Sequence, residues 1–211
     1  LLGGHGEAAR NPLPPFFWGY ATKTRELVHD PAVARRLLGQ AGLGQGFEAA
    51  ILTVDASRPY LPAPLRLAAR LRDDLAQVGI RLRQELASSW TDYVERGNRG
   101  QYDLAVFGWQ ADTMDPNDFL SAVLSSDAVG SSNRSRYRSF AMDGLLTQAR
   151  RGTGHQERSQ VYAEAQALFQ KEMPFVPLYH VAVFTASRRS LRGLSVGPTG
   201  FLRFDKAWKK D

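Results

Sequence analysis

The segment from residue 47 to residue 109 alternates between strand-like and helix-like hydrophobic patterns. Three short runs that are apolar or alternate apolar with polar residues read as strands, at residues 47–54, 80–86 and 102–109. A helical pattern follows the first strand and carries apolar residues on one face, namely Ala68, Leu71, Leu75 and Val78. Ser88 or Ser89 provides an N-cap for a short helix after the second strand. The order strand, helix, strand, helix, strand is typical of an α/β fold.

Helix boundaries outside this segment are marked by aspartate followed by proline. Asp30-Pro31 and Asp115-Pro116 each place a capping side chain before a proline in the first helical turn. Prolines at residues 12, 14 and 15 predict an extended path for residues 10–18. The other expected elements are helices at residues 31–41, 117–124, 140–150 and 157–172, a loop at 127–139, a strand-like stretch at 175–187, and irregular structure from 188 onward.

The composition is that of an ordinary globular protein, with 211 residues, 43% of them hydrophobic and 23% charged. The chain starts at leucine and not methionine, so we expect a processed or truncated N-terminus, and the lack of a visible signal peptide does not indicate the cytoplasm. The absence of cysteine excludes disulfides, and the four histidines lack metal-binding spacing, so no metal or other cofactor is expected. The net charge of +6 is spread over many separated arginines, which does not favour nucleic-acid binding.

Two charged residues follow strands of the expected sheet. The strand at 102–109 ends in Gly108 and Trp109, and Asp112 follows shortly after; Arg58 follows the strand at 47–54, with Pro59 fixing the local backbone. Ligands of open α/β sheets bind beyond the carboxyl ends of the strands. Arginine suits a carboxylate and aspartate suits a cation, so this pair matches the charges of a zwitterion. The alternative is that both residues lie in ordinary polar loops.

Asp112 and Asp115 also raise the possibility of a catalytic carboxylate pair, as in a hydrolase. The helix-start signal favours a capping role for Asp115, whereas Asp112 has no such structural explanation. The sequence GLSVG at 193–197 matches the hydrolase pattern G-x-S-x-G, but no histidine follows it, so we interpret it as a chance match.

Several segments, taken in order, resemble the family 5 extracellular solute-binding proteins, which are dipeptide, oligopeptide and nickel receptors of bacterial ABC importers. The similar segments are RNPLPP with WGY at 10–20, DPAVARRLLGQAGL at 30–43, GWQAD with DPNDFL at 108–120, Asn133 with the helix around Asp143, and PFVPLY at 174–179. They extend over nearly the whole chain.

The resemblance implies an α/β lobe of the type II periplasmic-binding-protein kind, a mixed sheet flanked by helices. Because members of the family are more than twice as long and enclose their ligand between two lobes, this lobe would be incomplete without an N-terminal lobe. Residues 1–187 would form the C-terminal lobe, and residues 188–211 would be the crossover and tail returning toward the N-terminal lobe. An exposed apolar face around Trp109 would then mark where that lobe lies.

The resemblance also implies roles for individual residues. In the family's dipeptide receptors, the residue matching Asp112 binds the ligand's α-amino group and the residue matching Arg58 binds its carboxylate. Trp109 would line the pocket, beside Gly108 and Gln110. The expected function is that of a peptide-binding component of an ABC importer, without catalysis, acting with a membrane permease in the periplasm or as a cell-surface lipoprotein. Alternatives are a receptor for a nickel complex, an opine or glutathione, and the carboxylate-dependent hydrolase.

Overall fold

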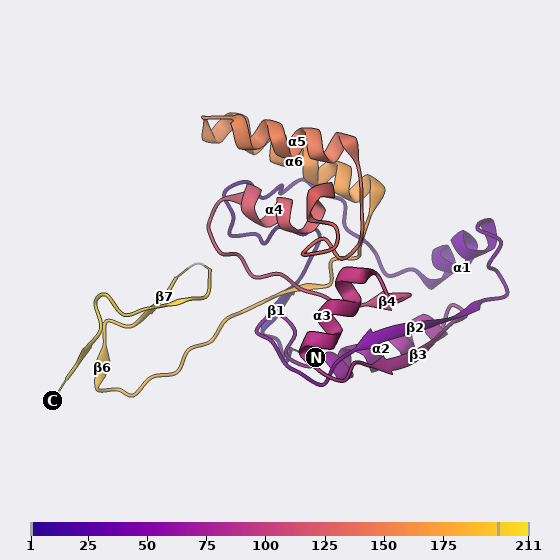
Figure 1. The fold of residues 1–211 in the computed structure, drawn as a ribbon, viewed down its shortest axis with the longest axis horizontal. Coiled ribbons are helices and arrows are strands. Elements are labelled where there is room, and N and C mark those ends of the chain that lie inside the picture. Colours follow the sequence, from indigo (N-terminus) through magenta and orange to yellow (C-terminus); the bar gives the residue numbers. More distant parts are fainter. Residues whose placement is uncertain (1, 198, 211) are drawn as a thin grey trace. The chain divides into compact units, whose positions relative to one another are not determined.

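The computed structural model describes residues 2–197 and 199–210, and these residues divide into two compact units. Unit 1 contains Arg25–Gly108 and Ser126–Arg138, and unit 2 contains Leu2–Thr24, Trp109–Ser125 and the described residues from Ser139 onward. Figure 1 shows the ribbon coloured along the chain. Each unit therefore combines segments that are distant in the sequence.

Unit 1 is the α/β part of the chain, as the alternating pattern predicts. Its elements are α1 (Pro31–Gln40), β2 (Phe47–Thr53), α2 (Pro64–Ala76), β3 (Ile80–Leu86), α3 (Trp90–Arg99), β4 (Leu104–Ala105) and the short 3₁₀ turn η1 (Ser126–Ala128). The three strands form one parallel sheet in the order β3-β2-β4. Asp30 and Ser89 cap α1 and α3 through their side chains, which confirms both predicted helix starts.

The register of the sheet begins at a pair of glycines. Phe47 lies opposite Ile80, and the pairing continues without interruption to Thr53 opposite Leu86. Just before this pairing, a Cβ added to Gly46 would come within 2.2 Å of the Gly79 carbonyl oxygen, and Gly46 itself has a φ of +78°. A side chain at Gly46 would therefore separate the strands where they start.

The central strand β2 is buried on both faces, which explains its nearly continuous apolar sequence. On one face Ile51 packs with Ala68 of α2 and Leu82 of β3, and on the other Leu52 packs with Ala87 and Tyr93. Successive side chains of a strand point to opposite faces, so adjacent residues of β2 serve two separate clusters. Figure 1 shows α2 and α3 with the sheet that they cover.

Unit 2 combines three helices with short antiparallel strand pairs. Its helices are α4 (Pro116–Leu124), α5 (Phe140–Arg151) and α6 (His155–Glu172), and α5 and α6 run side by side (Figure 1). Its strand pairs are β1 (Gly6–Ala8) with β5 (Tyr179–Val181), β6 (Leu191–Arg192) with β9 (Trp208–Lys209), and β7 (Ser195–Val196) with β8 (Leu202–Arg203).

The proline-rich N-terminal segment is held against α6 by one buried amide. Gln166 is fully buried, and its Oε1 accepts a hydrogen bond from the Ala21 N–H at 3.1 Å while its Nε2 donates to the Gly19 carbonyl at 2.8 Å. A Cβ on Gly19 would lie 2.8 Å from the Tyr162 ring, so only glycine permits this approach. The prolines prevent regular secondary structure in this segment, so a side chain supplies the hydrogen-bond partners of its backbone groups.

Three sequence predictions are wrong in detail. The strand predicted at 102–109 has only two residues in β4, because the Val106 carbonyl accepts a hydrogen bond from the Tyr93 hydroxyl at 2.5 Å and leaves the sheet. The stretch at 175–187 is strand only at β5. The region from 188 onward contains four two-residue strands, which are too short to produce a hydrophobic period.

We predict that Gln166→Leu lowers the free energy of unfolding by about 2–4 kcal/mol, because two backbone groups lose their partners at a buried position. Chemical denaturation followed by circular dichroism measures the effect. Gln160→Leu is the control, since Gln160 is exposed on the same helix, and we expect a change within about 0.5 kcal/mol. Equal effects of both substitutions would contradict the proposed role of Gln166.

Candidate functional site

The candidate site in unit 1 is built from the loops that follow its three parallel strands. Arg58 lies after β2, Trp90 begins the helix that follows β3, and Gly108 lies after β4. Because the strands are parallel, these three loops leave the sheet at the same edge, where α/β proteins bind their ligands.

Arg58 is held in place by a tight turn and by an aromatic ring. The backbone N–H and carbonyl groups of Arg58 and Leu61 bond to each other at 3.0 and 2.9 Å, and Leu61 is buried. The Arg58 guanidinium lies over the Trp90 ring, with Cζ 3.9 Å from its centroid, and Nη1 donates to the Ser57 carbonyl at 2.8 Å. It forms no ion pair with any residue of the described chain. The planar, forked guanidinium of Arg58 is therefore oriented by a cation–π contact, while its positive charge is not neutralised.

Position 108 must be glycine because the Tyr60 ring packs directly against its Cα. A Cβ on Gly108 would come within 2.3 Å of Cδ2 of that ring. Burial raises the pKa of the Tyr60 phenol, and the positive charges of Arg134 and Arg58 oppose this effect only in part. Tyr60 consequently presents a protonated hydroxyl beside the turn that carries Arg58.

A row of packed aromatic rings supports this edge of the sheet. The ring centroids of Trp90 and Tyr93 are 5.7 Å apart, and those of Tyr93 and Phe107 are 4.6 Å apart in a stacked arrangement. Burial raises the pKa of the Tyr93 phenol, whose hydroxyl donates to Val106. Trp90 and Tyr60 were not singled out in the sequence, because only the fold brings them to Arg58 and Gly108.

The other three predicted site residues belong to unit 2. Trp109 is half-buried where the sequence led us to expect an exposed face, and its indole Nε1 is buried without a hydrogen-bond partner among the described residues. Gln110 donates from Nε2 to the Thr199 carbonyl at 3.1 Å. Asp112 is exposed, and its carboxylate makes no hydrogen bond or ion pair with any described residue.

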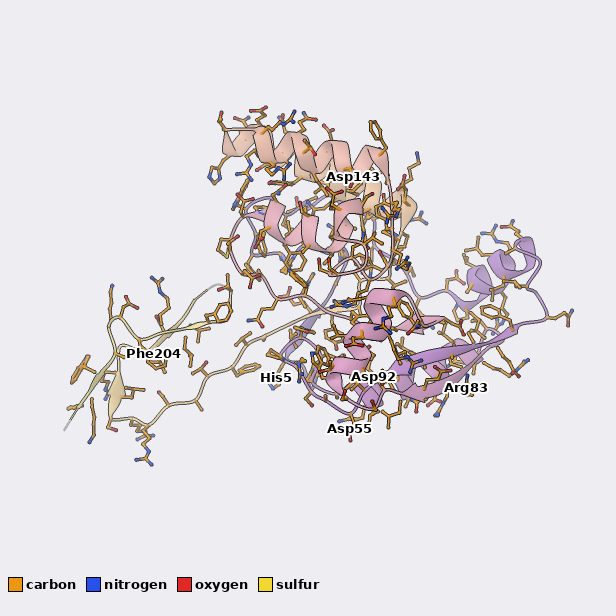
Figure 2. All side chains as sticks on the ribbon, in the orientation of Figure 1. His5, Asp55, Arg83, Asp92, Asp143 and Phe204 are labelled. Atoms are coloured by element: carbon orange, nitrogen blue, oxygen red, sulfur yellow. The ribbon has the colours of Figure 1, made fainter. Side chains whose placement is uncertain are left out.

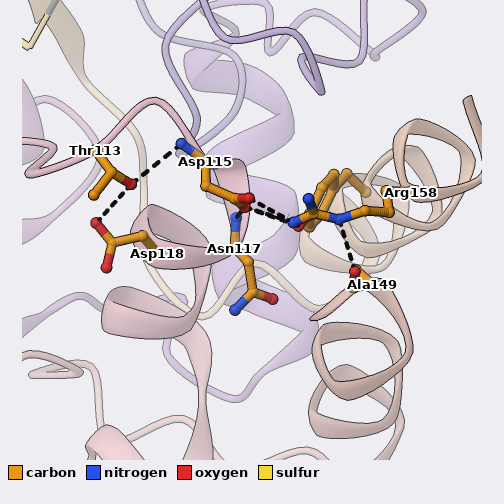
Figure 3. Close-up of polar contacts among 7 residues, drawn as sticks. Thr113, Asp115, Asn117, Asp118, Ala149 and Arg158 are labelled. Atoms are coloured by element: carbon orange, nitrogen blue, oxygen red, sulfur yellow. Dashed lines mark hydrogen bonds and ion pairs between the residues drawn. The ribbon is translucent and has the colours of Figure 1, made fainter. Parts of the chain in front are cut away.

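Asp115 has a structural role, in contrast to Asp112 (Figure 3). Its carboxylate caps α4 by accepting from the Asn117 N–H at 2.9 Å, and both carboxylate oxygens accept from Nη2 of Arg158 at 2.6 and 2.7 Å. Arg158 also donates from Nε to the Ala149 carbonyl at the end of α5. Desolvation acts to raise the pKa of Asp115, but the hydrogen bonds from Arg158 and Asn117 outweigh it and leave the pKa lowered.

These contacts confirm the predicted capping role of Asp115 and argue against a catalytic pair with Asp112. A carboxylate committed to an arginine and to a helix N-terminus is poorly placed to exchange protons with a substrate. Within residues 2–197 and 199–210, no group of three or more histidine, aspartate or glutamate side chains is arranged to hold a metal ion. No helix in the same described part is both long and apolar enough to cross a membrane.

Comparison with known proteins places this chain in a family. Residues 1–131 match the family described as bacterial extracellular solute-binding proteins, family 5 middle. This match covers more than half of the chain, and the chain belongs to family 5 of the bacterial extracellular solute-binding proteins. Members of this family bind solutes, and the relatives found here are named as binding proteins.

Three relatives illustrate the similarity. The chain is 33% identical over 201 residues to heme-binding protein A of Haemophilus influenzae, covering 95% of this chain and 37% of that protein. It is 31% identical over 195 residues to a dipeptide-binding protein of Pseudomonas aeruginosa, covering 92% and 36%. A crystal structure of a dipeptide-binding protein from Pseudoalteromonas in complex with Met-Leu is 30% identical, with a TM-score of 0.89, covering 100% and 41%. The chain thus spans little more than a third of the length of the curated relatives it matches.

We predict that Asp115→Asn, which keeps a capping side chain, lowers the free energy of unfolding by about 1–3 kcal/mol at neutral pH because Arg158 loses its counter-charge. The folded-state pKa of Asp115 lies below the ordinary value of 3.8. Its stabilisation is therefore present above that value and is lost as the pH falls through the folded pKa. Denaturant titrations at neutral pH and near pH 3 measure this, with exposed Asp118→Asn as the control. A difference between wild type and Asp115→Asn that does not shrink in acid would contradict the prediction.

We further predict that Gly108→Ala lowers the free energy of unfolding by about 1–3 kcal/mol, because the added methyl group displaces the Tyr60 ring. The double variant Gly108→Ala with Tyr60→Ala removes the clashing atoms. Its stability should match that of Tyr60→Ala alone within about 0.5 kcal/mol. A Gly108→Ala penalty that persists without the ring would place the constraint in the backbone and not in the contact with Tyr60.

Proposed function

We propose that this protein is the substrate-binding component of a bacterial ABC importer and that it binds dipeptides or short oligopeptides. The observation that carries the proposal is a pair of opposite, unneutralised charges at the two positions singled out in the sequence. Neither Arg58 nor Asp112 has an ion-pair partner in the described part of the chain. A short peptide with free ends carries the two complementary charges.

Arg58 would bind the peptide carboxylate. Its planar fork can donate two parallel hydrogen bonds to a carboxylate, which a lysine could not reproduce. Stacking on Trp90 fixes this fork before a ligand arrives, so less conformational freedom is lost on binding. Tyr60, whose ring packs against Gly108 and whose phenol is protonated, lies on the same edge.

Asp112 would bind the peptide ammonium. Enclosure of the ligand removes water from the carboxylate of Asp112 and from the ammonium group. Either charge alone would be strongly unfavourable in that environment, so the two groups stay paired. We assign Trp109 and Gln110, the neighbours of Asp112 in the sequence, to the lining of the same binding site.

The two curated relatives are named for different ligands, heme and dipeptides. Heme carries carboxylates but no ammonium group, so it offers nothing to Asp112. The combination of Arg58 with an unpaired Asp112 favours the peptide, and the same argument favours a zwitterion over a nickel complex. The structure complexed with Met-Leu supports this choice, since its ligand is a dipeptide.

We assign residues 1–187 to the C-terminal lobe of a two-lobed receptor and residues 188–211 to the segment that returns toward the N-terminal lobe. Closure of the lobes around the peptide would precede docking on a membrane permease. A receptor of this kind would work in the periplasm or, as a lipoprotein, at the cell surface. The role is binding without catalysis, because Asp115 is committed to Arg158 and α4.

We predict opposite ligand dependence for the two anchors, measured by calorimetry on the intact protein. The ligands are Ala-Ala, N-acetyl-Ala-Ala, Ala-Ala-amide and the doubly blocked dipeptide. Arg58→Ala should weaken Ala-Ala by about a hundredfold to several thousandfold, the factor for about 3–5 kcal/mol lost when an enclosed charge is unpaired. It should affect Ala-Ala-amide much less. Asp112→Asn should weaken Ala-Ala to a similar degree and affect N-acetyl-Ala-Ala least.

Arg81→Ala is the matched control, because Arg81 is exposed near the start of β3, at the edge of the sheet opposite the loops that follow the strands. If both anchor variants weaken all four ligands equally, the two residues support the fold and the assignment of anchors is wrong. If the wild-type protein binds none of the four ligands, the peptide-receptor function itself is wrong.

A further inference from the structure

A second arginine lies at the same edge of the unit 1 sheet without a counter-charge. Arg134 comes from the loop after η1, and its Cζ lies 4.7 Å from the centroid of the Phe107 ring. Its Nε is buried without a hydrogen-bond partner, and the guanidinium forms no ion pair with any residue that the structure describes. Charges removed from water are normally paired, because an unpaired charge in such a place is unfavourable.

Several contacts fix this side chain. The Tyr102 hydroxyl donates to the Arg134 carbonyl oxygen, and the neighbouring Asn133 is fully buried and donates from Nδ2 to the Tyr137 carbonyl at 2.9 Å. The aliphatic part of Arg134 passes close to Gly97 of α3, where an added Cβ would lie 3.1 Å from Cδ of Arg134. Contacts with the backbone and with the aliphatic part of Arg134 thus keep its guanidinium against the Phe107 ring.

Three acidic residues of unit 1 already have partners. Asp92 on α3 accepts hydrogen bonds from the N–H and hydroxyl of Ser88, Glu85 on β3 pairs with Arg96 and Arg83, and Asp103 accepts from the Ala50 N–H. Figure 2 labels Asp92 and Arg83 among the side chains of this unit. Burial lowers the pKa of the Arg134 guanidinium, opposed only by the tyrosines Tyr60, Tyr93 and Tyr102. Arginine nevertheless stays charged at neutral pH.

Arg134 and Arg58 are linked by the row of rings between them. Arg58 stacks on Trp90, Arg134 stacks on Phe107, and Tyr93 contacts both rings. The positive charges of both guanidiniums act to lower the pKa of the Tyr60 phenol, against the larger effect of burial. One ligand carboxylate can pair with one of these two guanidiniums, which leaves the other guanidinium without a partner.

We propose that Arg134 binds a second ligand carboxylate, so that the protein prefers peptides whose C-terminal residue is aspartate or glutamate. This inference rests on the proposed peptide-binding function. The α-carboxylate and the side-chain carboxylate of an acidic C-terminal residue are closer together than any other pair of carboxylates in a dipeptide. Such a residue therefore suits two guanidiniums that stack on rings of the same aromatic row.

The test compares Ala-Glu with Ala-Gln, and Ala-Asp with Ala-Asn, by calorimetry on the intact protein. These pairs differ in side-chain charge and hardly in shape. We expect the acidic peptide to bind at least about tenfold more tightly, a factor that corresponds to about 1.4 kcal/mol. Arg134→Gln should bring the ratio close to one while leaving the affinity for Ala-Gln within about threefold. Arg134→Lys keeps the charge without the planar fork and should retain an intermediate ratio.

Arg136→Gln is the matched control, because it removes one positive charge from the same loop at an exposed residue that donates to the Asn98 carbonyl. It should leave the ratio unchanged. If wild type binds Ala-Glu and Ala-Gln equally, the inference about Arg134 is wrong and the peptide-receptor function stands. If Arg134→Gln weakens all four peptides alike and lowers the melting temperature, Arg134 is a structural residue and the inference is again wrong. Failure to bind Ala-Ala or any of these peptides would instead reject the proposed function.

Discussion

The parallel pairing of β2 with β3 is the constraint on which the candidate site in unit 1 depends. Because the two strands run in the same direction from Gly46 and Gly79, their loops emerge at one edge and bring Arg58 to Trp90. An antiparallel pairing would send these loops to opposite edges. The close approach at Gly46 fixes where the pairing begins, and a shift of one residue would reverse the two faces of β2.

Aromatic rings, and not carboxylates, hold the arginines at this edge. Trp90 and Phe107 each present a ring face to one guanidinium, which is attracted to the ring without losing its charge. A carboxylate in either position would fix the arginine equally well but would compete with an anionic ligand. This arrangement keeps both forks ordered and available, and it is the physical basis for assigning them to ligand carboxylates.

Two aspartates only three positions apart in the sequence show how position determines role. Asp115 stands at the N-terminus of α4, where the exposed N–H groups and Arg158 favour its charged form. Asp112 precedes that turn in a loop and makes no polar contact with the residues that the structure describes. The same chemical group therefore stabilises the fold at one position and stays available for a cation at the other.

Local signals in the sequence determine most of the elements and two of the candidate anchors. Asp30-Pro31, Ser89 and Asp115-Pro116 set helix starts through contacts within one turn, and the hydrophobic periods set the strand and helix order. Charged residues that follow strands single out Arg58 and Asp112. Only tertiary structure decides which charges are neutralised and which are free, and it recruits Tyr60, Trp90 and Arg134 through contacts between distant segments. It also ends β4 early, because the Tyr93 hydroxyl of α3 donates a hydrogen bond to the Val106 carbonyl. No local pattern in the sequence indicates this contact.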